Sequence, residues 1–189
     1  HPGADYTSSI EDLKKQLVAA GIDVSLWSTG GAKTVEHLYE EIQAGEISLE
    51  SSAEYGVLRK TVVGNADVYC TDQSGKRFRL KEDRQIFTDG RERKRNLKKA
   101  VAEKMRIGEN PDSAMIRGIQ EELGLTGDFK LENLGVEEKI LESPSYPGIM
   151  TKYVIHSYKV ELNADQFKPE GYVEHQKDKD SFFVWEEVV

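Results

Sequence analysis

The sequence predicts an α/β fold with a helical extension at its N-terminal end, on three observations. Two amphipathic helix patterns precede residue 50, strand-like alternation begins at Val57, and one capped helix is expected over residues 111–123, between strand patterns. Strands on both sides of a single helix are typical of a mixed α/β sandwich. We therefore expect an N-terminal helical extension over residues 1–50 and a main domain over residues 51–189.

The composition is that of a folded globular chain. Of the 189 residues, 38% are hydrophobic and 32% are charged, and the net charge is −8. This balance argues against a disordered chain and against nucleic-acid binding by the whole surface. No apolar run approaches the length of a membrane span, so no membrane partner is expected.

Two helices are predicted in the N-terminal region. A capping-box pattern at residues 8–11 precedes apolar residues at helical spacing, and a second helix is expected over residues 34–44. Residues 23–27 are expected to form a short extended piece. Residues 30–34 resemble a phosphate-binding loop only in part, because Ala32 replaces the glycine before the lysine. A turn between two elements is the favoured interpretation, with anion binding at the helix start as the alternative.

From residue 57 onward the apolar residues alternate, which predicts strands. The expected strands, with a bend at Gly64 and Asn65, are residues 57–63, 66–70, 77–80, 85–88, 130–139, 151–162 and 181–185. Cys70 lies in this alternation and is expected to be a buried core thiol. As the lone cysteine it cannot form an internal disulfide, so we expect a reducing compartment, with the cytoplasm favoured. The chain begins with His-Pro-Gly rather than Met, so a native targeting segment could have been removed.

The helix over residues 111–123 has clear start and stop signals. Asn110 suits the N-cap, Pro111 suits the first helical position, and Gly124 is a natural stop. The apolar residues on one face are Met115, Ile116, Ile119 and Leu123. Glu121 and Glu122 then lie along the edge of the apolar stripe, where paired carboxylates suit a divalent cation. Solvated surface charge is the alternative interpretation of this pair.

Residues 103–125 resemble the Nudix box, the signature of the Nudix hydrolases. The positions that match at the required spacing are Glu109, Arg117, Ile119, Glu121, Glu122, Gly124 and Leu125. Two positions depart from the signature. Glu103 stands where the family has glycine, and Gly118 stands where the family has a glutamate that binds metal in many members.

The resemblance implies a Nudix-like α/β/α sandwich with a mixed sheet and a site for Mg²⁺ or Mn²⁺. Its expected metal ligands are Glu121, Glu122 and Glu103, the last as a replacement for the acid missing at position 118. The box residues expected to orient the loop–helix–loop are Glu109, Arg117 and Gly124. Some Nudix enzymes draw a catalytic base from a late loop, for which Glu174 or Glu170 is the candidate here. The expected catalytic residues are Glu121, Glu122 and Glu174.

The resemblance predicts a metal-dependent hydrolase that cleaves a nucleoside diphosphate linked to another moiety. The alternative is a catalytically impaired Nudix-fold module that binds a nucleotide or regulates, because Gly118 removes one charge from the metal cluster. The substrate is therefore expected to be a nucleotide-like diphosphate. The oligomeric state stays open, a homodimer included.

A basic tract lies directly before the box. It comprises Arg91, Arg93, Lys94, Arg95, Lys98, Lys99, Lys104 and Arg106. Lys104 and Arg106 are the expected diphosphate-binding residues, and Tyr146 in a later loop could stack on a nucleobase or brace its loop. The alternatives for the tract are a solvated face or an RNA-binding patch. RNA is disfavoured because no aromatic residue lies between Phe87 and Phe129.

Overall fold

A computed structural model describes residues 9–189, which divide into two compact units. The first unit comprises residues 9–63, Lys104–Glu109 and Val136–Ile155, and the second comprises Gly64–Glu103, Asn110–Gly135 and His156–Val189. Several strands contribute residues to both units. The separation of an extension at residues 1–50 stays a prediction.

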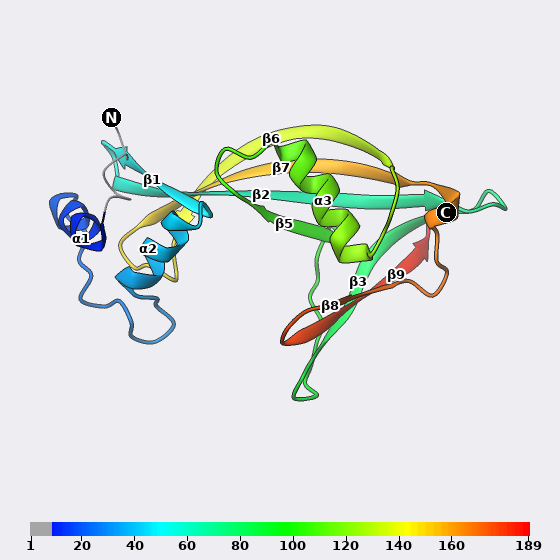
Figure 1. The fold of residues 1–189 in the computed structure, drawn as a ribbon, viewed down its shortest axis with the longest axis horizontal. Helices are drawn as coiled ribbons and strands as arrows, with labels where there is room; N and C mark the ends of the chain where they lie inside the picture. The colour runs from blue at the N-terminus through cyan, green and yellow to red at the C-terminus, as the bar shows by residue number, and fades with distance from the viewer. Residues whose placement is uncertain (1–8) are drawn as a thin grey trace. The chain divides into compact units, whose positions relative to one another are not determined.

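The first unit contains the two predicted N-terminal helices, α1 (Ile10–Ala19) and α2 (Val35–Gln43), drawn in blue in Figure 1. Ser9 caps α1, where its side chain accepts the Asp12 N–H, and Thr34 caps α2 in a reciprocal pair with His37. Both helices are therefore confirmed. They contribute Leu13, Leu17, Leu38 and Ile42 to one buried apolar cluster.

Residues 23–27 do not form the short extended piece expected from the sequence. The Asp23 side chain accepts the Ser25 N–H at 2.9 Å, which closes a turn, and Ser28 takes a left-handed backbone with φ of 66°. Trp27 is buried, and its indole N–H donates to the Pro147 carbonyl oxygen at 2.8 Å. The turn therefore directs a large aromatic side chain into the core of the first unit.

β2 (Gly56–Thr71) is one continuous strand rather than two strands with a bend. Neither Gly64 nor Asn65 takes the left-handed backbone that a tight turn needs. Buried positions continue to alternate with less buried ones beyond residue 64, which keeps the chain extended. β1 (Ile47–Ser52) pairs antiparallel with the first part of β2, from Ile47 opposite Thr61 to Ser52 opposite Gly56.

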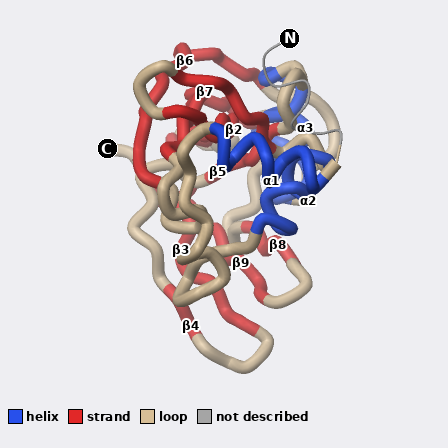
Figure 2. Tube along the Cα trace, turned by 90° about the vertical axis from the view of Figure 1, so that its left-hand side faces the viewer, coloured by secondary structure: helices blue, strands red, loops and turns tan. Residues whose placement is uncertain are grey.

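The second unit is built around a sheet. Its strands, some of which continue into the first unit, are β3 (Arg77–Phe87), β4 (Glu92–Arg93), β5 (Val101–Met105), β6 (Lys130–Glu142), β7 (Met150–Leu162), β8 (Tyr172–His175) and β9 (Lys179–Glu187). The hydrogen-bonded order is β6-β7-β2-β3-β9-β8, while β4 pairs with β3 and β5 pairs with β2. β4 lies beside the last part of β3, with Gln85 opposite Arg93 and Ile86 opposite Glu92 (Figure 2). A short 3₁₀ helix, η2 (Ala164–Gln166), follows β7.

β3 and β9 form a long antiparallel pair, from Phe78 opposite Glu187 to Phe87 opposite Lys179. The register shifts between Glu82 and Arg84, which marks a bulge. Cys70 on β2 is fully buried, as expected for a core thiol.

α3 (Pro111–Leu123), the green helix in Figure 1, is the predicted box helix. The Asn110 side chain accepts the Ser113 N–H at 3.0 Å, and Gly124 ends the helix with φ of 63°. Its buried residues are Ala114, Met115, Gly118, Ile119 and Leu123. The helix contacts β8. Helices and a large sheet confirm the predicted α/β class.

No helix in the described part of the chain combines the length and apolar content that a membrane span requires.

Candidate functional site

Glu122 is the box residue that α3 carries into the interior of the second unit. It is half-buried, whereas its neighbour Glu121 is exposed. The Oε2 atom of Glu122 is fully buried and has no hydrogen-bond partner. Burial raises the pKa of Glu122 to about 9, and the charges of Glu174, Glu103 and Glu82 add to the shift. Without a cation, this carboxyl group is therefore protonated at neutral pH.

Glu103 reaches α3 from the strand β5. A Cβ atom added at Gly118 would lie 2.5 Å from the Oε2 atom of Glu103, so the Glu103 side chain occupies the space above this glycine. A hydrogen bond to Glu103 is one cause of the raised pKa of Glu122. Two neighbouring carboxyl groups are more stable when one of them is protonated than when both are negatively charged.

Glu174, the predicted late-loop acid, lies on β8, the strand that α3 contacts. Burial is the main cause that raises the pKa of its carboxyl group. The negative charge of Glu103 adds to this effect, while Lys179 opposes it. The structure therefore brings Glu174 into the electrostatic neighbourhood of the box residues.

Glu82 on β3 is a buried acid that the sequence prediction missed. Arg95 grips it with two hydrogen bonds, Nε to Oε2 at 2.9 Å and Nη2 to Oε1 at 2.5 Å. Its negative charge raises the pKa values of Glu122 and Glu174. The signal was present in the sequence, because Glu82 occupies the same inward face of β3 as the buried Leu80.

These side chains form an acidic cluster, defined as Glu82, Glu103, Glu122 and Glu174. Oxygen donors of this kind suit a hard cation such as Mg²⁺, and the unpaired Oε2 atom of Glu122 lacks a partner that a cation would supply. As the side chains lie, no three His, Cys, Asp or Glu residues between residues 9 and 189 are arranged to hold a metal. The cluster therefore has the right chemistry for a cation, but its carboxylates would have to turn toward one.

A hollow of about 340 Å³ adjoins Glu82 in the second unit. Its lining residues are Lys81, Glu82, Asp83, Lys94, Arg95, Asn96 and Leu97. The hollow combines acidic and basic side chains, so it can accept a charged ligand beside the acidic cluster.

Two box residues shape the backbone at the two ends of α3, while their role in a functional site stays a prediction. Glu109 accepts the backbone N–H of Arg106 at 2.9 Å, which closes the loop before α3. Gly124 supplies the left-handed stop of the helix. Arg117 is exposed on α3, and its orienting role stays a prediction.

The predicted phosphate-binding residues Lys104 and Arg106 belong to the first unit. Lys104 lies 3.6 Å from the carboxylate of Glu46, and both side chains are about half exposed. Arg106 is exposed. Their contact with a substrate stays a prediction.

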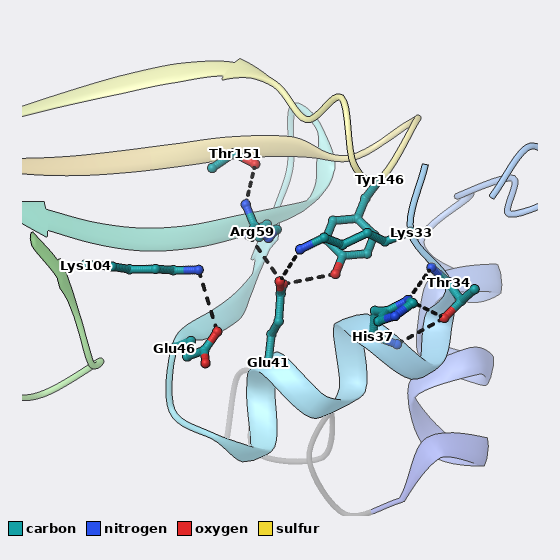
Figure 3. Close-up of polar contacts among 9 residues, drawn as sticks. All are labelled: Lys33, Thr34, His37, Glu41, Glu46, Arg59, Lys104, Tyr146 and Thr151. Atoms are coloured by element: carbon teal, nitrogen blue, oxygen red, sulfur yellow. Dashed lines mark hydrogen bonds and ion pairs between the residues drawn. The ribbon is translucent and has the colours of Figure 1, made fainter. Parts of the chain in front are cut away.

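Tyr146 lies in the interior of the first unit. Its side chain is fully buried, and its hydroxyl group donates to the Oε1 atom of Glu41 at 3.0 Å (Figure 3). Its ring packs against Trp27 at a centroid distance of 5.2 Å. In this arrangement the ring braces its loop, and contact of Tyr146 with a substrate stays a prediction that the burial does not favour.

Glu41 is the centre of a buried network in the first unit that the sequence did not reveal (Figure 3). Its Oε2 atom accepts from Lys33 at 3.0 Å, and its Oε1 atom accepts from Arg59 at 3.3 Å and from Tyr146. Burial tends to raise the pKa of Glu41, but Lys33, Arg59 and Tyr146 outweigh it and hold the pKa below its ordinary value. Both carboxylate oxygens are therefore satisfied.

The similarity of this chain to known proteins is to solved structures. No family model matches the chain, and no curated protein matches it. Among solved structures, the chain is similar to a C. elegans Ap4A hydrolase, with a TM-score of 0.39 and 15% identity over 67% of this chain and 80% of that chain. It is also similar to a binary complex of a C. elegans Ap4A hydrolase, with a TM-score of 0.38 and 17% identity, again over 67% of this chain and 80% of that chain. The acidic cluster is therefore the feature of this chain from which a function can be inferred.

Proposed function

We propose that the chain is a metal-dependent hydrolase that cleaves a nucleoside diphosphate linked to another moiety. The observation that carries the proposal is Glu122. It matches a metal-binding position of the Nudix box, and it holds an unpartnered buried oxygen among three other acids. A buried group that lacks its partner is costly unless a ligand or a cation completes it.

The residues that would hold Mg²⁺ or Mn²⁺ are Glu122, Glu103 and Glu121. Such an ion supplies charge neutralisation for the diphosphate and makes the phosphorus more electrophilic. Glu174 is our candidate for the proton acceptor from the attacking water, because its raised pKa makes it a better base than an ordinary glutamate. Arg95 holds both carboxylate oxygens of Glu82 by hydrogen bonds. Glu82 is therefore not counted among the residues that would turn toward the ion.

A nucleotide-like diphosphate is the proposed substrate class. The hollow beside Glu82 carries Lys81 and Lys94 as well as Arg95, and these cations suit phosphate oxygens. A negative substrate would then meet positive side chains on one side and the acids with their cation on the other.

Hydrolysis of a panel of nucleoside diphosphate derivatives, with and without Mg²⁺ or Mn²⁺, tests the proposal. We expect metal-dependent turnover that Glu122→Gln removes. Glu187→Gln is the matched control, since Glu187 is an exposed glutamate at the end of β9. Turnover that survives Glu122→Gln would contradict the proposal.

A nucleotide-binding module without turnover is the second candidate function. It is favoured by the missing acid at Gly118 and by the lack of a ready-made arrangement of metal ligands among the described side chains. Saturable nucleotide binding measured by calorimetry, together with no hydrolysis over the whole panel, would establish it in place of the hydrolase.

A further inference from the structure

Gly118 is unusual because it lies in the interior of α3 and is buried. Glycine is unfavourable in a helix interior, where it costs backbone entropy and contributes no side chain to the packing. Its backbone is helical, so no special conformation demands a glycine here. The reason lies in the space above it.

That space is filled by the side chain of Glu103. A Cβ atom at position 118 would lie 2.5 Å from Oε2, 2.8 Å from Cδ and 3.0 Å from Cγ of Glu103. Real Cβ atoms essentially never come this close to a neighbour. Any larger residue at 118 therefore requires Glu103 to move away.

Glu103 is unusual in a complementary way. It lies on the same face of β5 as Val101 and Met105, which are both buried, so an acid stands at an inward position of the strand. The Glu103 side chain is half-buried there. Its charge acts on both Glu122 and Glu174, which places its carboxylate among the acids of the cluster.

We infer that Glu103 supplies from β5 the carboxylate that α3 lacks at Gly118, so that the two departures from the box form one compensated exchange. The inference rests on the proposed function for the identity of the ligand, a divalent cation. In this exchange, one carboxylate of the cation site comes from residue 103 on the strand β5 instead of from residue 118 on the helix α3.

The first test is a stability cycle that needs no metal. Gly118→Ala is measured in the wild-type background and in the Glu103→Ala background, by thermal unfolding in the presence of EDTA. With Glu103 removed, the gain in helix propensity should raise the melting temperature by about 2 to 4 °C. With Glu103 present, the new methyl group meets its carboxyl group, so the gain should be absent or reversed.

The second test measures Mn²⁺ affinity by calorimetry. Glu103→Ala should weaken Mn²⁺ binding by about 10-fold or more, by analogy with the loss of other residues that support metal sites. The double variant Glu103→Ala with Gly118→Glu should regain most of this affinity, because the carboxylate then comes from α3. Glu187→Ala, at an exposed glutamate, is the control.

The two tests separate this inference from the proposed function. An equal effect of Gly118→Ala in both backgrounds would overturn the exchange, whatever the protein hydrolyses. Wild-type Mn²⁺ affinity in Glu103→Ala, or no recovery in a folded double variant, would also overturn it. If the wild type binds no Mn²⁺, the proposed function and the ligand role both fail, while the thermal coupling still reports the packing of Glu103 against residue 118.

Discussion

Glu41 in the first unit is a buried glutamate on a helix, Glu122 in the second is a half-buried one, and their surroundings are opposite. Glu41 meets two cations and a hydroxyl group, so each of its oxygens accepts a hydrogen bond. Glu122 meets other acids, and one of its oxygens has no hydrogen-bond partner. The pKa of Glu41 is lowered, whereas that of Glu122 is raised to about 9. Burial alone therefore does not mark a site; the charge of the neighbours does.

The difference predicts opposite roles for the two residues. A carboxylate whose partners are complete contributes to the stability of the fold, and removing it leaves Arg59 as a buried charge without its counter-ion. A carboxyl group whose partners are other acids contributes little to stability, and it is retained for what it binds. The four predictions that follow test this contrast.

The largest expected effect is on the activity of Glu122→Gln. We expect the hydrolysis rate to fall by about 1,000-fold, within the range known for the loss of a residue that acts in proton transfer or metal binding. The free energy of unfolding should stay unchanged or rise, because an amide replaces a protonated carboxyl group of the same shape. Loss of fold stability in this variant would place Glu122 with Glu41 as a structural residue.

Glu41→Gln should have the reverse profile. The free energy of unfolding, measured by chemical denaturation, should fall by about 3 kcal/mol because a buried ion pair loses its negative partner. The rate per folded molecule should stay near that of the wild type. A fall in the hydrolysis rate with an unchanged free energy of unfolding would contradict the structural role assigned to Glu41.

The contribution of Glu41 to stability should also depend on pH. Its pKa in the folded protein lies below the ordinary value of 4.5, so its stabilisation is complete above pH 4.5 and is lost as the pH falls through the folded value. The difference in unfolding free energy between the wild type and Glu41→Gln should therefore shrink on acidification. A difference that stays constant from pH 7 to pH 3 would contradict the ionised state assigned to Glu41.

Tyr146→Phe should have the smallest effect. The variant loses the hydrogen bond to Glu41 but keeps the packing of the ring, so stability should fall by about 1 to 2 kcal/mol. The KM for the best substrate should not change, because the side chain is enclosed in the core. An increase in KM without loss of stability would return Tyr146 to the substrate site.

The helix α3 could be predicted from the sequence because its signals are local. Asn110, Pro111 and Gly124 act on backbone groups within a few residues, and each lies where expected. The spacing also placed Glu121 and Glu122 on an edge of the helix. Periodicity could not show which of the two is buried, since that depends on the strands that pack against the helix.

Glu82 and the Glu41 network escaped prediction because their hydrogen-bond partners are distant in sequence. Tyr146 bonds to Glu41 across 105 positions, and Arg95 bonds to Glu82 across 13. No local pattern records such pairs. The sequence left open whether Tyr146 stacks on a nucleobase or braces its loop, because the carboxylate that accepts its hydroxyl group is so far away along the chain.

The packing of Glu103 against Gly118 has a consequence for how relatives of this protein are recognised. A motif search that scores each position separately counts residues 103 and 118 as two independent mismatches and lowers the score twice. If one substitution compensates the other, the two positions evolve as a pair, and an acid at the first should accompany a glycine at the second. Sequences that carry both changes would then form a lineage that is recognised by covariation rather than by the consensus.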